Sequence, residues 1–176
     1  LFGYISNAHP LFVEPPTKTQ QQHASHVAMS VGKLLSRIVA PFQKKSNDKD
    51  DISRPTGSLY DYSYGIKTDP LTQFACVFTA LIHDCDHLGI SNQRMVEEKH
   101  ELCERFGDRS VAEQQSIDMA WEHLMDDKFT NFRNALMPDL DTATRFRQLV
   151  VNGVMATDIM DKGLKEARNA RWAITF

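Results

Sequence analysis

The 176-residue sequence lacks several features that mark other protein classes. Its three cysteines, Cys76, Cys85 and Cys103, are an odd number with no CxxC pair, which argues against a disulfide framework and favours reduced thiols in a cytoplasmic setting. No apolar run reaches the roughly 20 residues that a membrane helix needs. The first residues lack the basic-then-apolar order of a signal peptide. A net charge of only −3 gives no reason to expect nucleic acid or an anionic membrane as a partner.

Alternation of apolar and polar residues between hairpin turns, the pattern of a β-fold, is also missing. Helical periodicity is present instead. Residues 27 to 38 carry an apolar stripe of Val27, Val31, Leu34, Leu35 and Ile38, which Pro41 is expected to end. The predicted fold class is therefore all-α, a multi-helix bundle.

Start and stop signals predict the other helices. Asp69 and Pro70 suit the N-cap and first turn of the most apolar helix, which Gly89 is expected to end. Residues 91–107 are predicted to form one short helix or two. A further helix is predicted to begin at Ser110. A last long helix is predicted from Thr142 to Ala170.

Two segments contain few helical signals. Residues 1–22 hold proline and glutamine with weak periodicity and are predicted to be irregular. Residues 42–69 are polar, contain proline and glycine, and are predicted to be a long surface loop within a helical domain over 23–176. The chain does not begin with Met, so it is expected to be a piece of a longer protein.

The segment "LIHDCDHLGISNQ", residues 81–93, places His83, Asp84, Asp86 and His87 within five positions, directly after an apolar run. Imidazole nitrogens and carboxylate oxygens are ligands for zinc and similar cations. Unpaired charge at the end of an apolar helix is costly, and metal binding or mutual pairing is the usual resolution.

A second pair of histidines, His23 and His26, opens the first helix at spacing i, i+3. Because helix bundles build metal sites from facing helices, this helix and the segment at 83–87 are predicted to share an ion. His26 alone is more simply a surface or partly buried histidine, and Asp86 is more simply a partner for a nearby backbone group or histidine.

The motif and its surroundings resemble the class I 3′,5′-cyclic-nucleotide phosphodiesterases, metal phosphohydrolases of the HD type. "FACVFTALIHDCDHLGISNQ" resembles their metal-site helix with its H-D-x-D-H-x-G-x-S-N pattern. "HASHVAMSVGKLLSRI", "SVAEQQSIDMAWEHLM" and "LVVNGVMATDIMDK" resemble other family segments in the same order. The similarity runs from about residue 23 to residue 168.

The resemblance implies a set of residue roles. His23 and His83 would be zinc ligands, and Asp84 would bridge zinc to a second divalent cation, Mg²⁺ or Mn²⁺. His87 and Glu113 would orient waters near these ions. The implied reaction is hydrolysis of cyclic AMP or cyclic GMP to a 5′-monophosphate in signal transduction.

Other readings of two residues remain open. Glu113 also stands three residues after Ser110, the spacing of a helix capping box. Asp158 either lines the substrate pocket or faces solvent. Gln114 and Gln115 stand where the family often has Asn and His, so no role carries over to them.

The sequence departs from the family in two ways. In "KTQQQHA", Thr19 takes the place of the histidine that protonates the leaving 3′ oxygen, and losing a general acid typically costs about 10²- to 10⁴-fold in rate. The family's last zinc aspartate and its base-binding clamp lie beyond the matched segments, so the chain looks like the first half of a catalytic domain.

These departures leave an alternative function, a truncated or degenerate relative that keeps the helical scaffold and a partial metal site without turnover. A more distant phosphohydrolase of the His-Asp class explains the downstream similarity less well. In the family, membrane tethers lie outside the catalytic domain, so any tether would belong to a longer chain. No sequence pattern indicates an oligomeric state.

Overall fold

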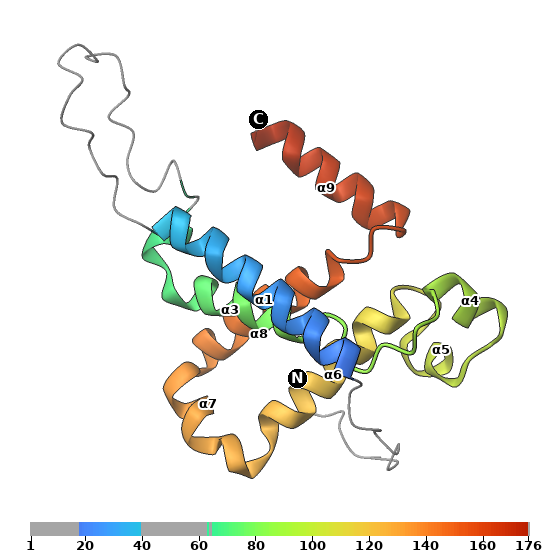
Figure 1. The fold of residues 1–176 in the computed structure, drawn as a ribbon, viewed down its shortest axis with the longest axis horizontal. Helices are drawn as coiled ribbons and strands as arrows, with labels where there is room; N and C mark the ends of the chain where they lie inside the picture. The colour runs from blue at the N-terminus through green and yellow to red at the C-terminus, as the bar shows by residue number, and fades with distance from the viewer. Residues whose placement is uncertain (1–17, 40–62, 64, 176) are drawn as a thin grey trace.

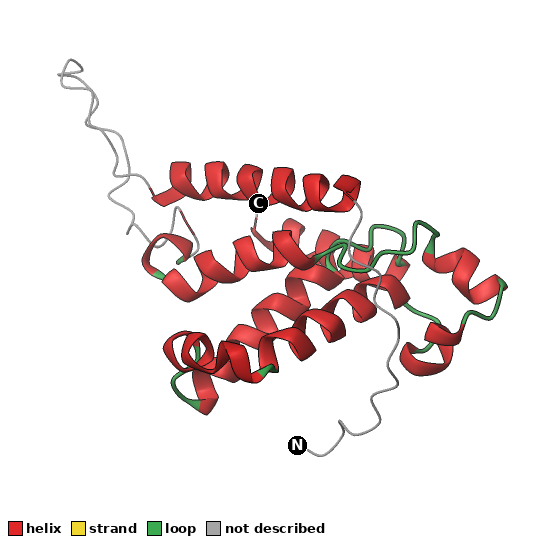
Figure 2. Cartoon of the chain, turned by 60° about the horizontal axis from the view of Figure 1, so that its bottom comes forward, coloured by secondary structure: helices red, strands yellow, loops and turns green. Residues whose placement is uncertain are grey.

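The computed structural model describes residues 18–39, 63 and 65–175. All regular secondary structure in these residues is helical, which confirms the all-α prediction (Figures 1 and 2). The elements are α1 (Lys18–Val39), η1 (Ile66–Thr68), α3 (Pro70–Ile82), α4 (Asn92–Glu97), α5 (Glu101–Phe106), α6 (Val111–Met125), η2 (Asp127–Phe129), α7 (Thr130–Leu136), α8 (Leu140–Met155) and α9 (Lys162–Thr175). None of the helices in the described residues has the length and apolarity to cross a membrane.

Helix α3 is the centre of the bundle, and it packs against α1 on one side and α8 on the other (Figure 2). It begins as predicted, with Pro70 in its first turn and the Asp69 carboxylate accepting the Thr72 N–H at 3.3 Å. Since α3 ends at the functional motif, its packing fixes where that motif lies.

The main core is aromatic. Phe146 of α8 is fully buried, and its ring centroid lies 5.9 Å from that of Phe74, 5.6 Å from Phe78 and 6.3 Å from Trp121. These side chains join α3, α6 and α8 into one unit. A smaller core of Met95, Leu102 and Val111 holds α4 and α5 against the start of α6.

The chain enters α1 earlier than expected. Residues 18–22 are helical rather than irregular, because lysine and glutamine are good helix formers. The predicted stripe on α1 is partly wrong, since Leu34 is 57% exposed and Ile38 is 40% exposed. Of the predicted loop 42–69, residues 42–62 and 64 lie outside the described residues, and Ile66–Thr68 forms a short 3₁₀ helix.

The prediction that Gly89 ends the central helix is wrong. Helix α3 ends at Ile82, and the next residues form tight turns in which the Cys85 N–H donates to the Ile82 carbonyl and the His87 N–H to the Asp84 carbonyl. Asp86 adopts a left-handed backbone with φ of 58°, which an α-helix cannot contain.

The predicted helix from Thr142 to Ala170 is two helices with a break at residues 156–161 (Figure 1). The Asp158 carboxylate accepts the backbone N–H groups of Met160 and Asp161, and the Asp161 carboxylate accepts that of Leu164. Such local bonds from aspartate compete with helical ones. Asp161 is also paired with Arg109, which ties the start of α9 to the segment before α6.

Candidate metal centre

Three side chains, one from α1 and two from the turns that follow α3, converge where α1 passes the end of α3. The His23 Nε2 lies 3.3 Å from the His83 Nε2 and 3.4 Å from the Asp84 Oδ2, and the His83 Nε2 lies 3.3 Å from the same Oδ2. Among the described residues, no other group of three His, Cys, Asp or Glu side chains is placed to share a metal ion.

The His83 ring is held in one orientation by its own helix. Its Nδ1 lies 3.0 Å from the Ala80 carbonyl oxygen. Since a carbonyl only accepts hydrogen bonds, Nδ1 carries a proton, and in the neutral ring Nε2 is the nitrogen with the lone pair, directed towards His23 and Asp84. A histidine that binds metal is commonly fixed in this way.

The separations between the three donor atoms are compatible with a metal site. Charge-assisted N–H···O bonds are usually about 2.7–2.9 Å long, and both N···O separations here are longer. Tetrahedral zinc with ligands at about 2.0–2.1 Å separates its ligand atoms by about 3.3–3.4 Å. Two imidazole nitrogens and a carboxylate oxygen are also a donor set that zinc accepts.

The site is open on one side. The His83 side chain is 12% exposed, whereas those of His23 and Asp84 are 53% and 41% exposed. Three protein ligands with a solvent-facing position are typical of catalytic zinc sites, since structural sites are closed by four.

The turn that carries these ligands is held by its neighbours. From α6, the Ser116 hydroxyl donates to the Cys85 carbonyl at 2.7 Å, and the Gln115 amide donates to the Asp86 carboxylate at 3.2 Å. From α1, the Gln20 amide donates to the His87 carbonyl at 2.9 Å. Asp86 therefore has a structural partner, but that partner is a glutamine side chain rather than the backbone or histidine that we expected.

Two nearby groups have local roles in the structure. The His87 Nδ1 accepts the Gly89 N–H at 3.0 Å, and His87 is not one of the three converging side chains. Burial raises the pKa of the Cys85 thiol, and the neighbouring Asp86 charge raises it further. Cys85 therefore stays a neutral thiol, which is not a good metal ligand.

His26 is exposed on α1, as the simpler reading predicted.

The predicted capping box at Ser110 and Glu113 is wrong. Ser110 has a left-handed backbone with φ of 46°, and its side chain makes no cap to α6. The Glu113 carboxylate instead accepts from the Asn92 amide at 2.9 Å. The role of Glu113 near the metal stays a prediction. Sequence reasoning assigned no role to Asn92, although Asn92 closes the quoted H-D-x-D-H-x-G-x-S-N pattern.

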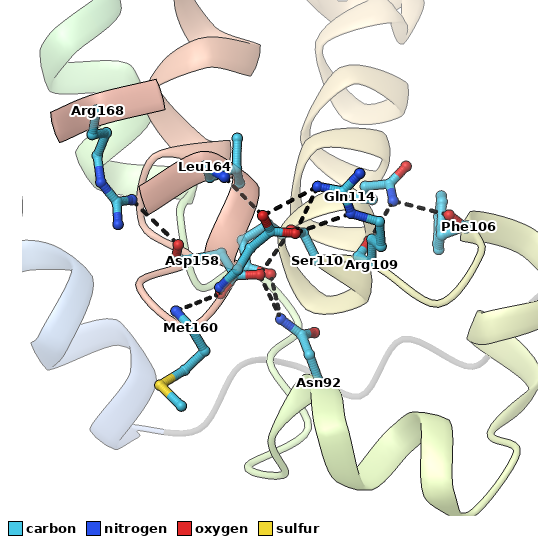
Figure 3. A network of polar contacts seen from close by, with 11 residues as sticks. Asn92, Phe106, Arg109, Ser110, Gln114, Asp158, Met160, Leu164 and Arg168 are labelled. Carbon is cyan, nitrogen blue, oxygen red and sulfur yellow. Dashed lines mark hydrogen bonds and ion pairs between the residues drawn. The ribbon is translucent and has the colours of Figure 1, made fainter. Parts of the chain in front are cut away.

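Asp158 does not face solvent. It is 6% exposed, and both of its carboxylate oxygens accept hydrogen bonds from within the chain (Figure 3). Its predicted contact with substrate stays a prediction, which these internal bonds do not favour. Thr19 is exposed in the first turn of α1, one turn before His23.

Comparison with known proteins finds one matching family model and several proteins of similar sequence. A family model described as 3′5′-cyclic nucleotide phosphodiesterase matches residues 20–166. The chain is 36% identical over 86 residues to a human dual specificity calcium/calmodulin-dependent 3′,5′-cyclic nucleotide phosphodiesterase 1C, over 49% of this chain and 12% of that protein. It is 32% identical over 89 residues to a probable 3′,5′-cyclic-AMP phosphodiesterase of Caenorhabditis elegans. Those residues are 51% of this chain and 13% of the Caenorhabditis elegans protein.

A mouse 3′,5′-cyclic-AMP phosphodiesterase 4C is 34% identical over 91 residues, which are 51% of this chain and 12% of the mouse protein. The matched segments thus span about an eighth of the length of each of these relatives.

Proposed function

The chain belongs to the 3′,5′-cyclic nucleotide phosphodiesterase family, and from that premise we propose that His23, His83 and Asp84 hold zinc in a centre for the hydrolysis of cyclic nucleotides. The substrate would be cyclic AMP or cyclic GMP, and the product a nucleoside 5′-monophosphate that ends a signal. The activity, substrate and product are proposals, because the chain matches only part of its relatives.

One observation carries the proposal, the near-equilateral triangle of donor atoms with sides of 3.3, 3.3 and 3.4 Å. If all three donors presented lone pairs with nothing between them, they would repel one another. A proton or a cation at the centre of the triangle removes that repulsion. The separations agree with those between the ligands of a zinc ion, about 3.3–3.4 Å.

The three residues contribute in different ways. His83 presents Nε2 because Ala80 holds its Nδ1 proton. Asp84 has a second carboxylate oxygen and is 41% exposed, so it can also face a second cation, Mg²⁺ or Mn²⁺. Bound divalent cations would bind the phosphate oxygens and lower the pKa of a water molecule.

A second candidate function is supported by Thr19. Its hydroxyl stands where the resemblance implies a proton donor for the leaving 3′ oxygen, and a threonine hydroxyl has no useful acidity at neutral pH. A chain with this substitution would keep the helical scaffold and a partial metal site, with turnover reduced by about 10²- to 10⁴-fold. We propose this weak or absent turnover for the 176-residue chain itself.

Two measurements test these proposals. Metal analysis of the purified chain should find about one zinc, and His83→Ala should lose it. Absence of zinc from the wild type, or its retention in His83→Ala, would contradict the site. Hydrolysis of cyclic AMP and cyclic GMP should then be assayed with magnesium present, and rapid turnover by the wild type would contradict the second candidate.

The variant Thr19→His separates a missing proton donor from other defects. If the general acid is the main loss, this variant should raise the rate of hydrolysis by up to about 10²- to 10⁴-fold. Its zinc content should equal that of the wild type. An unchanged rate would show that a residue other than Thr19 limits turnover.

A further inference from the structure

We propose that Asn92 is a positioning residue for the metal centre, acting through helix α6; the inference rests on the proposed function. Asn92 lies at the start of α4, and its side-chain amide makes three hydrogen bonds to groups in two other parts of the chain. Figure 3 shows Asn92 beside one of these partners, Asp158. None of these three bonds involves His23, His83 or Asp84.

The first role of Asn92 is to cap α6 from outside that helix. The first N–H groups of a helix have no partner within it, and an N-cap side chain usually accepts one from the second or third residue. Ser110 precedes α6 but makes no such bond, because it adopts a left-handed backbone. The Asn92 Oδ1 accepts the N–H of Ala112, the second residue of α6, at 2.9 Å.

The second role is to hold two carboxylates together. The Asn92 Nδ2 donates to the Glu113 Oε2 at 2.9 Å and to the Asp158 Oδ2 at 3.3 Å. Ser110 donates to the same Asp158 oxygen at 2.7 Å. The start of α6 is thereby joined to the break between α8 and α9. A neutral amide with one acceptor and two donors suits this place, whereas an aspartate would add a third carboxylate.

Helix α6 carries this positioning to the metal centre. One turn after Ala112 and Glu113, the helix presents Gln115 and Ser116, which bind Asp86 and the Cys85 carbonyl. Those two residues directly follow the ligand Asp84. A shift of the first turn of α6 would therefore move Gln115 and Ser116, which bond the two residues after Asp84. The distances from Asp84 to His23 and His83 would then change.

Two variants of Asn92 test this inference in the full chain. Asn92→Asp keeps the size and the acceptor for Ala112 but replaces the donor with a charge. Asn92→Ser has a side chain too short to bond the carboxylates of Glu113 and Asp158, and it adds no charge. It replaces Asn92→Asp in the test if the charged variant fails to fold. Asn152→Asp, at an exposed position of α8, is the matched control for the added charge.

The readouts are zinc affinity, by competition with a coloured chelator, and the visible spectrum of the cobalt-substituted protein. Both are measured where circular dichroism shows wild-type helicity. Substitution of residues that orient metal ligands typically weakens metal affinity by about 10- to 100-fold. We expect the Asn92 variants to bind zinc about 10-fold more weakly than the wild type. Their cobalt spectra should also change, while Asn152→Asp should match the wild type. A residue that only stabilises the fold would change neither readout under these conditions.

Ser116→Ala tests the route through α6, because it removes the bond to the Cys85 carbonyl. If Asn92 acts through this helix, the double variant with Asn92→Ser should lose less affinity than the two single losses combined. Fully independent losses, or wild-type zinc affinity in folded Asn92 variants, would overturn the inference while leaving the site intact. Absence of zinc from the wild type would instead defeat the proposed function.

Discussion

Zinc should raise the melting temperature of the chain, and His83→Ala should abolish that rise. The reason is that His23 belongs to α1 while His83 and Asp84 follow α3, so an ion bound by all three would connect two packed helices in the folded state only. A ligand at about 100 times its dissociation constant stabilises a protein by about 2.7 kcal/mol. For a chain of this length, each kcal/mol corresponds to about 2–4 °C. The expected rise is therefore about 5–11 °C.

The assay is thermal unfolding by circular dichroism, with the chain first stripped by a chelator and then titrated with zinc. His26→Ala is the matched control, because His26 is another exposed histidine of α1 that lies outside the ligand group. Its rise should equal that of the wild type. No rise in the wild type, or the same rise in His83→Ala as in His26→Ala, would refute the reasoning.

The loss of affinity in His83→Ala can also be estimated. Four-ligand structural zinc sites bind with about 10–16 kcal/mol, or about 2.5–4 kcal/mol for each ligand. Removing one ligand should thus weaken binding by about 10²- to 10³-fold, since 1.4 kcal/mol corresponds to a factor of ten. Asp84→Asn keeps the shape of the side chain and removes its charge, so it tests the carboxylate separately.

Three further predictions concern the scaffold. Phe146→Ala removes the fully buried ring at the centre of the core and should cost about 3–5 kcal/mol in urea denaturation. Gly153→Ala places a Cβ 2.8 Å from the Thr79 Cγ2 and should destabilise the chain by about 1–3 kcal/mol, an effect that Thr79→Ala in the same chain should largely relieve. The Leu164 N–H and the Arg109 guanidinium lower the pKa of Asp161 below its ordinary value. The stability from Asp161 should therefore be present above the unfolded pKa, near 3.9, and be lost as pH falls through the lower folded pKa. Thermal melts of Asp161→Asn and wild type from pH 3 to 6 should converge at the acid end, and parallel curves would contradict this.

The elements that the sequence predicted correctly depend on local patterns. Asp69 and Pro70 start α3, and the apolar spacing of Phe146, Val150 and Val154 marks the buried face of α8, because capping and helical periodicity are properties of short segments. The convergence of His23 with residues 83 and 84 was expected from ligand chemistry and family resemblance. Helix periodicity alone would not have selected His23 over His26.

The wrong predictions share a different physical origin, which is competition between local and distant partners. Ser110 and Glu113 have the spacing of a capping box, yet both side chains bind groups from other segments. Asp158 and Asp161 interrupt a helix that apolar periodicity alone would continue. Buried polar groups must find partners, and the identity of a partner 48 or 66 residues away is not encoded in a local pattern.

The end of α3 explains why the ligand motif needs more than a helix. Consecutive residues of an α-helix point about 100° apart, so neighbours such as His83 and Asp84 do not face each other on a regular helix. Here the helix gives way to tight turns at His83, and both side chains reach within 3.3 Å of each other. Such turns leave backbone carbonyls without helical partners. The hydroxyl of Ser116 and the amide of Gln20 bind the carbonyls of Cys85 and His87, which lets His83 and Asp84 converge with His23 at an open surface. The geometry of the site therefore depends on α1 and α6 as much as on the motif itself.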